Sequence, residues 1–265
     1  MHIVDLQNIG TLLLQELSLL RHSAAIKAPE GKGAGGDRTY YIDRFAEEMI
    51  LSRLQDLHEP LTVVSEEAGM LNLFGGGKTV LVDPIDGSRN AVAGLPFYGT
   101  SIAVAEGTTV GDISLAYVIN LVNGEAFWAE KGQGAFSAGG RMHCQTGDTL
   151  SFVAYEAPIP MDDLPPIVPL LSAARKARCM GATALDLSYL ASGAVGVFVT
   201  ASSSRSFDFA GGYLLVKESG GIVTDMQGNS IDHIELGLKK STSLLAAGNA
   251  ALHEKALALL RPGSR

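Results

Sequence analysis

A buried-strand pattern that ends in two aspartates is the feature that most limits how this chain can fold. The apolar run at residues 80–82 continues directly into Asp-Pro-Ile-Asp at 83–86, so two carboxylates three residues apart leave the sheet together. Proline fixes φ and removes an amide donor, and Gly87 opens the next turn. Ser88 and Asn90 suit the start of a short helix. The segment therefore predicts a strand, a sharp turn and a helix.

The predicted turn combines groups that attract anions with groups that repel them. The N–H groups at a helix start attract anions, whereas aspartates repel them. Both kinds of group belong to one site only if divalent cations lie between the carboxylates and the anion. This combination favours a metal-bridged phosphate. One pair of aspartates is also typical of an ordinary solvated turn, so the interpretation needs more carboxylates.

Two further acidic segments have the same form. A strand pattern at 61–64 is followed by acidic residues and a glycine, and Glu66 there can complete an oxygen-only site at the sheet edge. Asp208 stands before a helix predicted at 209–218, where taken alone it would be an N-cap. The small residues at 210–212 permit close packing of that helix against another element. Three acidic clusters at element ends favour a metal site over three unrelated turns.

The rest of the pattern predicts an α/β protein with two halves acting as one unit. Helices are predicted at 6–20 and 41–57, with a glycine-rich mobile flap at 27–38 that forms no regular element. Strands are predicted at 61–64, 79–82, 98–105, 114–119 and 125–129, then at 150–154, 195–199, 222–224 and 244–246. The later helices are predicted at 162–176, 184–191, 209–218 and 250–260. We place the division between an N-terminal half, residues 1–143, and a C-terminal half, residues 144–265.

Composition excludes several classes of protein. Apolar residues form 46% and charged residues 18% of the 265 residues, which excludes a disordered chain. The net charge of −8 and the lack of a basic stripe argue against a nucleic-acid groove. We expect no membrane span and no secretory signal, and therefore a cytoplasmic protein. Cys144 and Cys179 lack metal-type spacing and are predicted to be free, buried thiols.

Other polar or aromatic residues receive ordinary structural interpretations. Glu47 and Glu48 are predicted to form an exposed helix face, and the aspartates at 162–163 a helix start. Trp128 is predicted to lie in a strand, in the core or at an interface. The histidines are scattered without zinc-binding spacing. None of these residues is assigned to the site.

The three acidic motifs, in this order, resemble those of the inositol monophosphatase and fructose-1,6-bisphosphatase superfamily of magnesium-dependent, lithium-sensitive phosphatases. Ser-Glu-Glu-Ala-Gly at 65–69 is similar to its E-E motif, 83–90 to its D-P-I-D-G-[ST]-x-N motif, and 208–221 to its D-x-A-[AG]-G…E-[AS]-G-G motif. Weaker similarity runs from 33 to 249. The resemblance implies a layered α-β-α-β-α sandwich with the site where the two halves meet, and a homodimer.

The resemblance also implies the ligands of two magnesium ions. Glu66, Asp83 and the Ile85 carbonyl match the ligands of the first ion. Asp83, Asp86 and Asp208 match those of the second, so that Asp83 bridges the pair. A third, weaker Mg²⁺ site in the family uses Glu66 and water. Hard oxygen ligands suit Mg²⁺, and two to three ions per site are expected.

The mechanism implied by the resemblance is in-line attack of a metal-bound water on a phosphate monoester. Ser88, with Glu66 or Asp43, is expected to orient and deprotonate that water. The N–H groups of Gly87 and Ser88 are expected to hold phosphate oxygens. Serine at 88, where many members have threonine, retains the hydroxyl.

Substrate choice is expected to depend on the segments around residues 181 and 208. Animal inositol monophosphatases carry a glutamate seven residues before the last metal-binding aspartate, where this chain has Ala201. Arg205 matches archaeal-type members that accept both inositol phosphate and fructose 1,6-bisphosphate, and an arginine can grip a second phosphate. The alternative for Arg205 is a solvated loop cation.

Asn90, Gly181 and Thr183 match positions that line the substrate pocket of the family, although Ala182 replaces a common serine or threonine. We therefore expect hydrolysis of inositol 1-phosphate, fructose 1,6-bisphosphate or both. The first alternative is a phosphatase of 3′-phosphoadenosine 5′-phosphate, which shares the metal motifs. The second is a weakly active relative that regulates by binding a partner.

Overall fold

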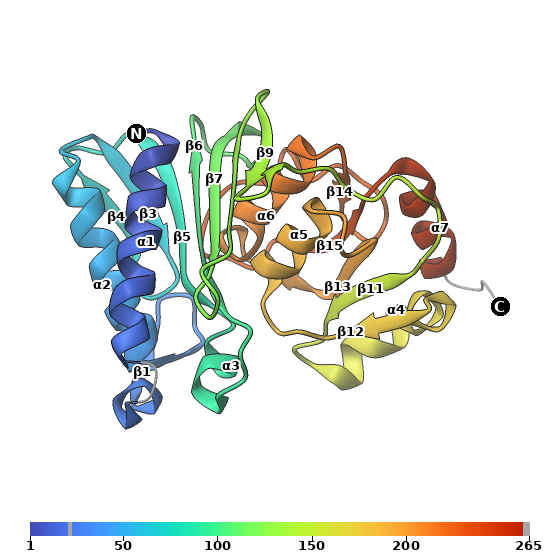
Figure 1. Ribbon diagram of the computed structural model, residues 1–265, viewed down its shortest axis with the longest axis horizontal. Coiled ribbons are helices and arrows are strands. Elements are labelled where there is room, and N and C mark those ends of the chain that lie inside the picture. The colour runs from blue at the N-terminus through green and yellow to red at the C-terminus, as the bar shows by residue number, and fades with distance from the viewer. Residues whose placement is uncertain (21–22, 262–265) are drawn as a thin grey trace.

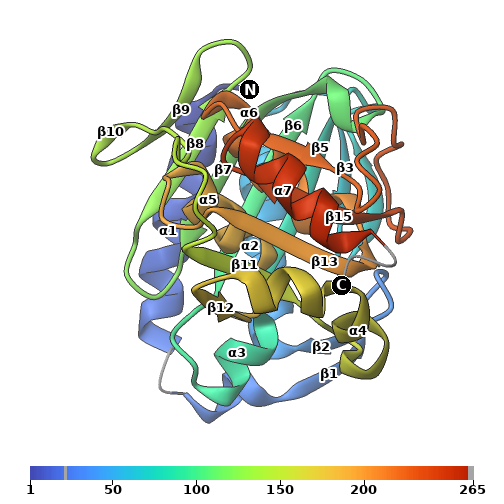
Figure 2. The ribbon, with the colours of Figure 1, turned by 90° about the vertical axis from the view of Figure 1, so that its right-hand side faces the viewer.

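Five layers of secondary structure form the molecule. The computed structural model describes residues 1–20 and 23–261. Helices α1 (Ile3–Leu20) and α2 (Tyr41–Asp56) cover an eight-stranded sheet, α5 (Thr183–Ala191) and α6 (Ser206–Glu218) form the middle layer, and a five-stranded sheet follows. Helices α4 (Pro160–Ala173) and α7 (Ala250–Leu260) cover the outer face of the second sheet (Figure 1 and Figure 2). This order confirms the predicted α-β-α-β-α sandwich.

The eight-stranded sheet brings two acidic segments together. Its order is β10-β9-β8-β7-β6-β5-β3-β4, and all neighbouring strands are antiparallel except β3 and β5. The strands are β3 (Leu61–Ser65), β4 (Gly69–Leu73), β5 (Lys78–Asp86), β6 (Gly99–Ala105), β7 (Ile113–Asn120), β8 (Ala126–Glu130), β9 (Gly134–Ser137) and β10 (Gly140–Arg141). Because β3 and β5 are parallel, with Ser65 opposite Val82, their carboxyl ends lie at one edge. Glu66 and Asp83, which follow Ser65 and Val82 along the chain, therefore lie side by side at that edge.

The five-stranded sheet has the order β12-β11-β13-β15-β14. Its strands are β11 (Phe152–Glu156), β12 (Lys176–Arg178), β13 (Val197–Ser204), β14 (Ile222–Thr224) and β15 (Thr242–Ala247). Strand β11 is parallel to both of its neighbours, whereas β15 is antiparallel to β13 and β14. Glu156, at the end of β11, accepts the Gly181 N–H just before α5. The start of α5 in turn contacts Asp86 at the acidic turn of β5.

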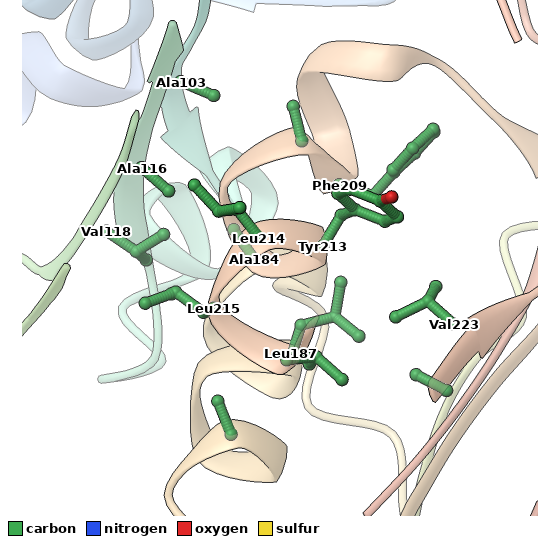
Figure 3. Close-up of a cluster of buried hydrophobic side chains, with 14 of the residues drawn as sticks. Ala103, Ala116, Val118, Ala184, Leu187, Phe209, Tyr213, Leu214, Leu215 and Val223 are labelled. Carbon is green, nitrogen blue, oxygen red and sulfur yellow. The ribbon is translucent and has the colours of Figure 1, made fainter. Parts of the chain in front are cut away.

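The middle layer is apolar on both sides. Figure 3 shows Val118 of the first sheet beside Leu215 of α6, and Val223 of the second sheet on the other side of that helix. A Cβ atom on Gly212 would lie 2.4 Å from the Cβ of Leu187 in α5. The predicted close packing behind Asp208 is therefore confirmed: Gly212 lets α6 approach α5, and Gly211 lets it approach Ser101 and Val118 of the first sheet.

Several predicted elements differ from the structure. The flap is not irregular, because β1 (Pro29–Lys32) and β2 (Arg38–Tyr40) form an antiparallel hairpin after the short 3₁₀ helix Ala24–Lys27. A hairpin needs only backbone donors and acceptors, so side-chain pattern did not reveal it. The predicted helix at 162–176 ends at Ala173, and Lys176 instead begins edge strand β12. Strands β4, β9 and β10 were also missed, and the 3₁₀ turn Val110–Asp112 precedes β7.

The remaining structural expectations have mixed outcomes. Both cysteines are free, but only Cys144 is buried; the prediction of a buried thiol is wrong for Cys179. Trp128 lies in β8 as predicted and stacks on Phe136. Asp163 lies in the first turn of α4. Across residues 1–20 and 23–261, no helix has the length and apolar character that a membrane span requires.

Candidate active site

The acidic turn of β5 is shaped by a β-bulge. Asp83 pairs with Ser101 and Asp86 with Gly99, so residues 84–85 lie opposite the single residue Thr100. The Thr100 hydroxyl donates to the Pro84 carbonyl at 2.6 Å. The strand thus continues through Asp86, beyond the predicted end at 82, because the bulge keeps it paired while its backbone bends.

A short helix follows the bulge as predicted. Helix α3 (Ser88–Ala93) starts directly after Gly87, which caps it with φ of 85°. A side chain at 87 would be strained at this φ, and its Cβ would lie 2.9 Å from the Gly181 carbonyl oxygen. Glycine is therefore required both by the turn and by the close approach of the chain from the second half of the molecule.

Four carboxylates predicted to bind metal converge at this turn. Asp83 and Asp86 are only 4% and 7% exposed. Burial raises the pKa of Asp83, and the negative charges of Glu66, Asp86 and Asp208 raise it further. Burial likewise raises the pKa of Glu66, with Asp208 the next contributor. Asp208 contributes to the raised pKa values of Glu66, Asp83 and Asp86, so the structure brings together residues that are more than 140 positions apart in the sequence.

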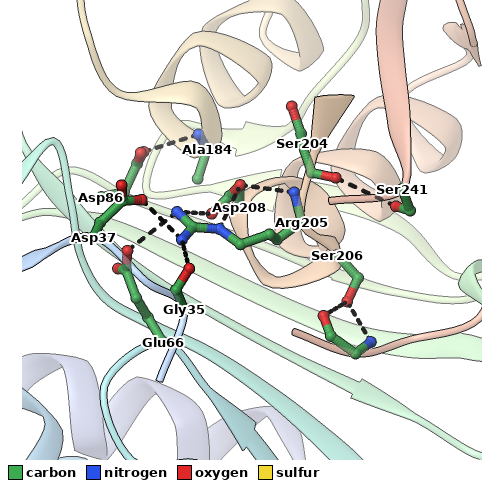
Figure 4. A network of polar contacts seen from close by, with 11 residues as sticks. Gly35, Asp37, Glu66, Asp86, Ala184, Ser204, Arg205, Ser206, Asp208 and Ser241 are labelled. Carbon is green, nitrogen blue, oxygen red and sulfur yellow. Dashed lines mark hydrogen bonds and ion pairs between the residues drawn. The ribbon is translucent and has the colours of Figure 1, made fainter. Parts of the chain in front are cut away.

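The side chain of Arg205 lies inside this cluster (Figure 4). Its Nη2 atom is 3.2 Å from Oε1 of Glu66 and 3.3 Å from Oδ1 of Asp208. Its Nη1 atom contacts Oδ2 of Asp37 at 2.8 Å and donates to the Gly35 carbonyl at 3.0 Å. Arg205 is 7% exposed, so the alternative of a solvated loop cation is wrong. The guanidinium partly compensates the buried negative charge and ties the flap to the site.

Asp208 lies at the start of α6 but is not its N-cap. The cap position belongs to Arg205, and Asp208, in the first turn, accepts the Arg205 N–H at 2.9 Å. Burial raises the pKa of Asp208, and the Arg205 charge opposes this effect. The sequence predicted that Asp208 lies near the helix start. The structure shows that it lies within the first turn and accepts a hydrogen bond from Arg205.

The donor set suits a hard divalent cation. The Oδ1 atom of Asp83 is buried without a hydrogen-bond partner among the described residues, which is the state expected of an atom reserved for a cation. The cluster offers carboxylate oxygens, the ligand type that Mg²⁺ prefers. As the side chains lie, no three His, Cys, Asp or Glu groups in residues 1–20 and 23–261 have metal-holding geometry. Between Glu66 and Asp208 the structure places the Arg205 guanidinium, which contacts both carboxylates.

Asp43 and Ser88 lie at the starts of two different helices, α2 and α3. Asp43 is 3% exposed in the first turn of α2 and accepts the Tyr40 N–H at 2.7 Å. Burial raises its pKa to about 7, assisted by the charges of Glu67 and Glu47. Ser88 is half-buried at the start of α3. No hydrogen bond joins its hydroxyl to Asp43 or Glu66 in the part of the chain that the structure describes, so the predicted pairing stays a prediction.

Two of the three predicted substrate-pocket residues, Asn90 and Gly181, join the two halves, because the Asn90 amide is 3.4 Å from the Gly181 carbonyl oxygen. The Asn90 amide donates to the carbonyls of Phe97 at 2.8 Å and Met180 at 2.7 Å. The Gly181 N–H donates to Oε1 of Glu156 at 2.8 Å. Thr183 begins helix α5. Asn90 and Gly181 therefore hold the loop before α5 against α3 with their polar groups, which the sequence pattern alone did not show.

Asp86 anchors the start of α5. Its Oδ2 atom accepts the N–H groups of Ala184 at 2.8 Å and Leu185 at 3.3 Å. Burial raises the pKa of Asp86 to about 8, while the Leu185 N–H opposes the shift. One carboxylate thus contacts both halves of the molecule at the proposed metal site.

The sequence pattern did not predict the environment of Glu47 or the presence of a second acidic pair near the site. Glu47 is 4% exposed, so the prediction of an exposed face is wrong for it, whereas Glu48 is exposed. Glu47 follows Asp43 by four residues on one helix face, and this spacing was the available signal. The half-buried Glu156 and the buried Asp186 form a second acidic pair that no motif indicated.

The whole chain is similar to known phosphatases. The family model described as "Inositol monophosphatase family" matches residues 3–264. A fructose-1,6-bisphosphatase/inositol-1-monophosphatase from Methanothermobacter thermautotrophicus is 36% identical over 239 residues, covering 86% of this chain and 85% of that protein. The enzyme of the same name from Thermococcus kodakarensis is 33% identical, covering 84% and 82%.

The fold comparison agrees. The crystal structure of the extragenic suppressor protein suhB from Bartonella henselae matches with a TM-score of 0.84 and 25% identity, covering 98% of each chain. The structural match is complete in length, and the family match includes all three acidic motifs. The chain therefore belongs to the inositol monophosphatase family of magnesium-dependent phosphomonoesterases and has the α/β fold of that family.

Proposed function

We propose that this protein hydrolyses inositol 1-phosphate, fructose 1,6-bisphosphate or both. The observation that carries the proposal is the convergence of Glu66, Asp83, Asp86 and Asp208 beside the start of α3, where the two halves meet. The relatives described above, which are named for both activities, support the choice of substrates.

Two to three Mg²⁺ ions are proposed as cofactors. Glu66, Asp83 and the Ile85 carbonyl would hold one ion, and Asp83, Asp86 and Asp208 would hold another. Bound Mg²⁺ supplies activated water and offsets the charge of the ester. The unpartnered Oδ1 of Asp83 supports its place as the shared ligand.

Protein groups would orient the reactants around the ions. Asp43, with its pKa raised to about 7, can accept a proton near neutral pH, directly or through the Ser88 hydroxyl. Glu66 is the second group proposed for this role. The backbone N–H groups of Gly87 and Ser88 are proposed to hold phosphate oxygens at the start of α3.

Arg205 is proposed to contact a second phosphate in fructose 1,6-bisphosphate. Its guanidinium is engaged by Asp37, Glu66 and Asp208. It would need to release at least one of these partners to bind a phosphate. The exposed partner, Asp37, costs least to release because its charge is already solvated.

A homodimer is also proposed, as the family resemblance implies. Phe97 of the first half lines one apolar hollow together with Phe152 and Met180 of the second half, and Phe152 is 42% exposed. Exposed apolar groups of this kind support an interface. Sedimentation of the purified protein measures its stoichiometry, and a monomer at micromolar concentration contradicts this part of the proposal.

A panel of phosphate esters tests the activity. Phosphate release is measured with inositol 1-phosphate, fructose 1,6-bisphosphate and 3′-phosphoadenosine 5′-phosphate, each with Mg²⁺ and with EDTA. The expected result is Mg²⁺-dependent release from one or both of the first two. Preference for the adenosine compound selects the alternative phosphatase. No release from any ester contradicts the proposal and favours a regulatory binding protein.

A further inference from the structure

Glu47 is buried beneath the turn that carries Glu66. Its Oε1 atom accepts the N–H of Ala68 at 2.8 Å and that of Glu67 at 3.2 Å. The same oxygen accepts a short hydrogen bond from the Ser65 hydroxyl. These donors lie on both sides of Glu66, so one carboxylate oxygen holds the chain before and after it.

The opposite side of this turn receives the flap. The Gly35 N–H donates to the Glu66 carbonyl at 2.7 Å, and the Ala34 N–H donates to the Glu67 carbonyl at 3.0 Å. Figure 4 shows Gly35 next to Glu66, with Arg205 donating to the Gly35 carbonyl. The turn therefore lies between Glu47 on α2 and the backbone of the flap.

Helix α2 connects this support to the rest of the site. Asp43 lies four residues before Glu47, on the same helix face, and both side chains are buried. Movement of that face would displace Asp43 and the support of Glu66 together. Glu48, the next residue, is exposed, and among the described residues no hydrogen bond joins its side chain to the turn.

We propose that Glu47 is a positioning residue that sets the geometry of Glu66 for divalent cation binding and aligns the turn on which the flap docks. It touches neither substrate nor metal, and it acts through the backbone on both sides of Glu66. The inference rests on the proposed function, because it assigns to Glu66 the role of a metal ligand. Partners that orient metal ligands typically change metal affinity by about 10–100-fold when they are removed.

The pair Glu47→Gln and Glu48→Gln provides a matched test. Both variants remove one negative charge from adjacent positions of α2, but only the first weakens the charge-assisted hydrogen bonds to the turn. Mn²⁺ serves as the probe, with its dissociation constant measured by calorimetry on the full chain. The Mg²⁺ activation constant and kcat are measured in parallel with the ester that the wild type hydrolyses.

The expected result is a dissociation constant for Mn²⁺ raised about 10-fold in Glu47→Gln and unchanged in Glu48→Gln. The Mg²⁺ activation constant should rise by the same factor, and saturating Mg²⁺ should restore kcat to within about twofold, because the mispositioned ligand is still present. A purely structural role would lower the melting temperature of Glu47→Gln without moving the Mn²⁺ constant, and that result overturns the inference.

Ser65→Ala is the second variant in case Glu47→Gln does not fold. It removes one of the three donors from the other side of the contact, and a weaker but measurable loss of Mn²⁺ affinity, about threefold, is expected. Unchanged affinity in this variant overturns the inference. A wild type that binds Mn²⁺ but releases no phosphate refutes the proposed function alone, since the Mn²⁺ comparison between variants still tests Glu47.

Discussion

Two buried groups of carboxylates lie at the junction of the two halves, and the protein stabilises them by different means. The first group, at the proposed metal site, contains the Arg205 guanidinium between Glu66 and Asp208. The second group is the pair Glu156 and Asp186, with no cationic partner among the described residues. The comparison shows two ways to stabilise a buried carboxylate: a nearby cation can offset its charge, or a bound proton can remove the charge. Only a site that uses a cation can take up a different cation, such as Mg²⁺, in its place.

The second pair relies on a proton. No N–H or O–H group of the described residues donates to either carboxylate oxygen of Asp186. Burial raises the pKa of Asp186, and the charges of Glu156 and Asp86 raise it further. Burial also raises the pKa of Glu156, although the Gly181 N–H opposes this. Two carboxyl groups can hydrogen-bond to each other only if one of them is protonated, so this pair depends on a proton where the first group has the Arg205 guanidinium.

Replacing the shared ligand of the metal site should have the largest effect. Asp83→Asn is expected to lower phosphate release by at least about 10³-fold at saturating Mg²⁺. The substitution weakens the binding of both proposed ions, and several kcal/mol of charge stabilisation in the transition state are lost with them. Circular dichroism of the variant controls for folding. Near wild-type turnover would show that the first group is not a metal site.

Removing the internal cation should destabilise the metal-free protein. Arg205→Met leaves Glu66 and Asp208 without a counter-charge, which is expected to cost about 3 kcal/mol of unfolding free energy in EDTA. The bridge to Asp37 contributes little because Asp37 is exposed. Urea unfolding with EDTA and with Mg²⁺ measures the effect, and Mg²⁺ should stabilise this variant more than the wild type. Equal stability in EDTA contradicts the assigned role of the guanidinium.

Asp186→Asn should stabilise the protein in a pH-dependent way. The raised pKa means that folded Asp186 stays protonated while the unfolded chain ionises above about pH 4, so the wild type loses stability as the pH rises through this window. The amide cannot ionise and can donate to Glu156. The variant should therefore gain about 2 kcal/mol at pH 8, and the gain should vanish near pH 4.

Asp163→Asn is the control for this prediction. Asp163 is equally buried, but its oxygens accept the Ile159 N–H at 2.7 Å and the Ser202 hydroxyl at 2.7 Å. An amide there replaces an acceptor with a donor, so a loss of about 1 kcal/mol is expected. Stabilisation by both substitutions, or by neither, would show that the missing donors at Asp186 do not explain its behaviour.

The smallest expected effect concerns the thiols. Burial raises the pKa of Cys144 to about 12. Cys179 is exposed at the surface, but partial desolvation of its thiol and the charges of Glu156 and Asp186 raise its pKa to about 11. Cys179 should react slowly with a disulfide reagent at pH 8, and Cys144 only after unfolding. Glu156→Gln should accelerate the reaction of Cys179 about threefold. An unchanged rate means that the second acidic pair does not influence this thiol.

The metal-site residues could be predicted because each belongs to a local pattern. An apolar run shows where β5 lies, and Asp83, Asp86 and Gly87 follow it in a spacing that defines the turn. The parallel pairing of β3 and β5 then brings Glu66 to Asp83, as the common edge of the sheet predicts. Glu47 was missed because its hydrogen-bond partners lie on the β3–β4 turn, far from it in the sequence. Its four-residue spacing from Asp43 was the one local sign that separates it from the exposed Glu48.

The sequence by itself determined the acidic motifs, the order of most helices and strands, and the family to which the chain belongs, because these depend on periodicity and on residues that are close in the chain. Only the tertiary structure decided that Arg205 lies among carboxylates, that Glu47 supports the Glu66 turn and that Asp186 lacks a donor. Burial and charge compensation depend on groups from several elements, so their energies are defined only once the halves have packed together.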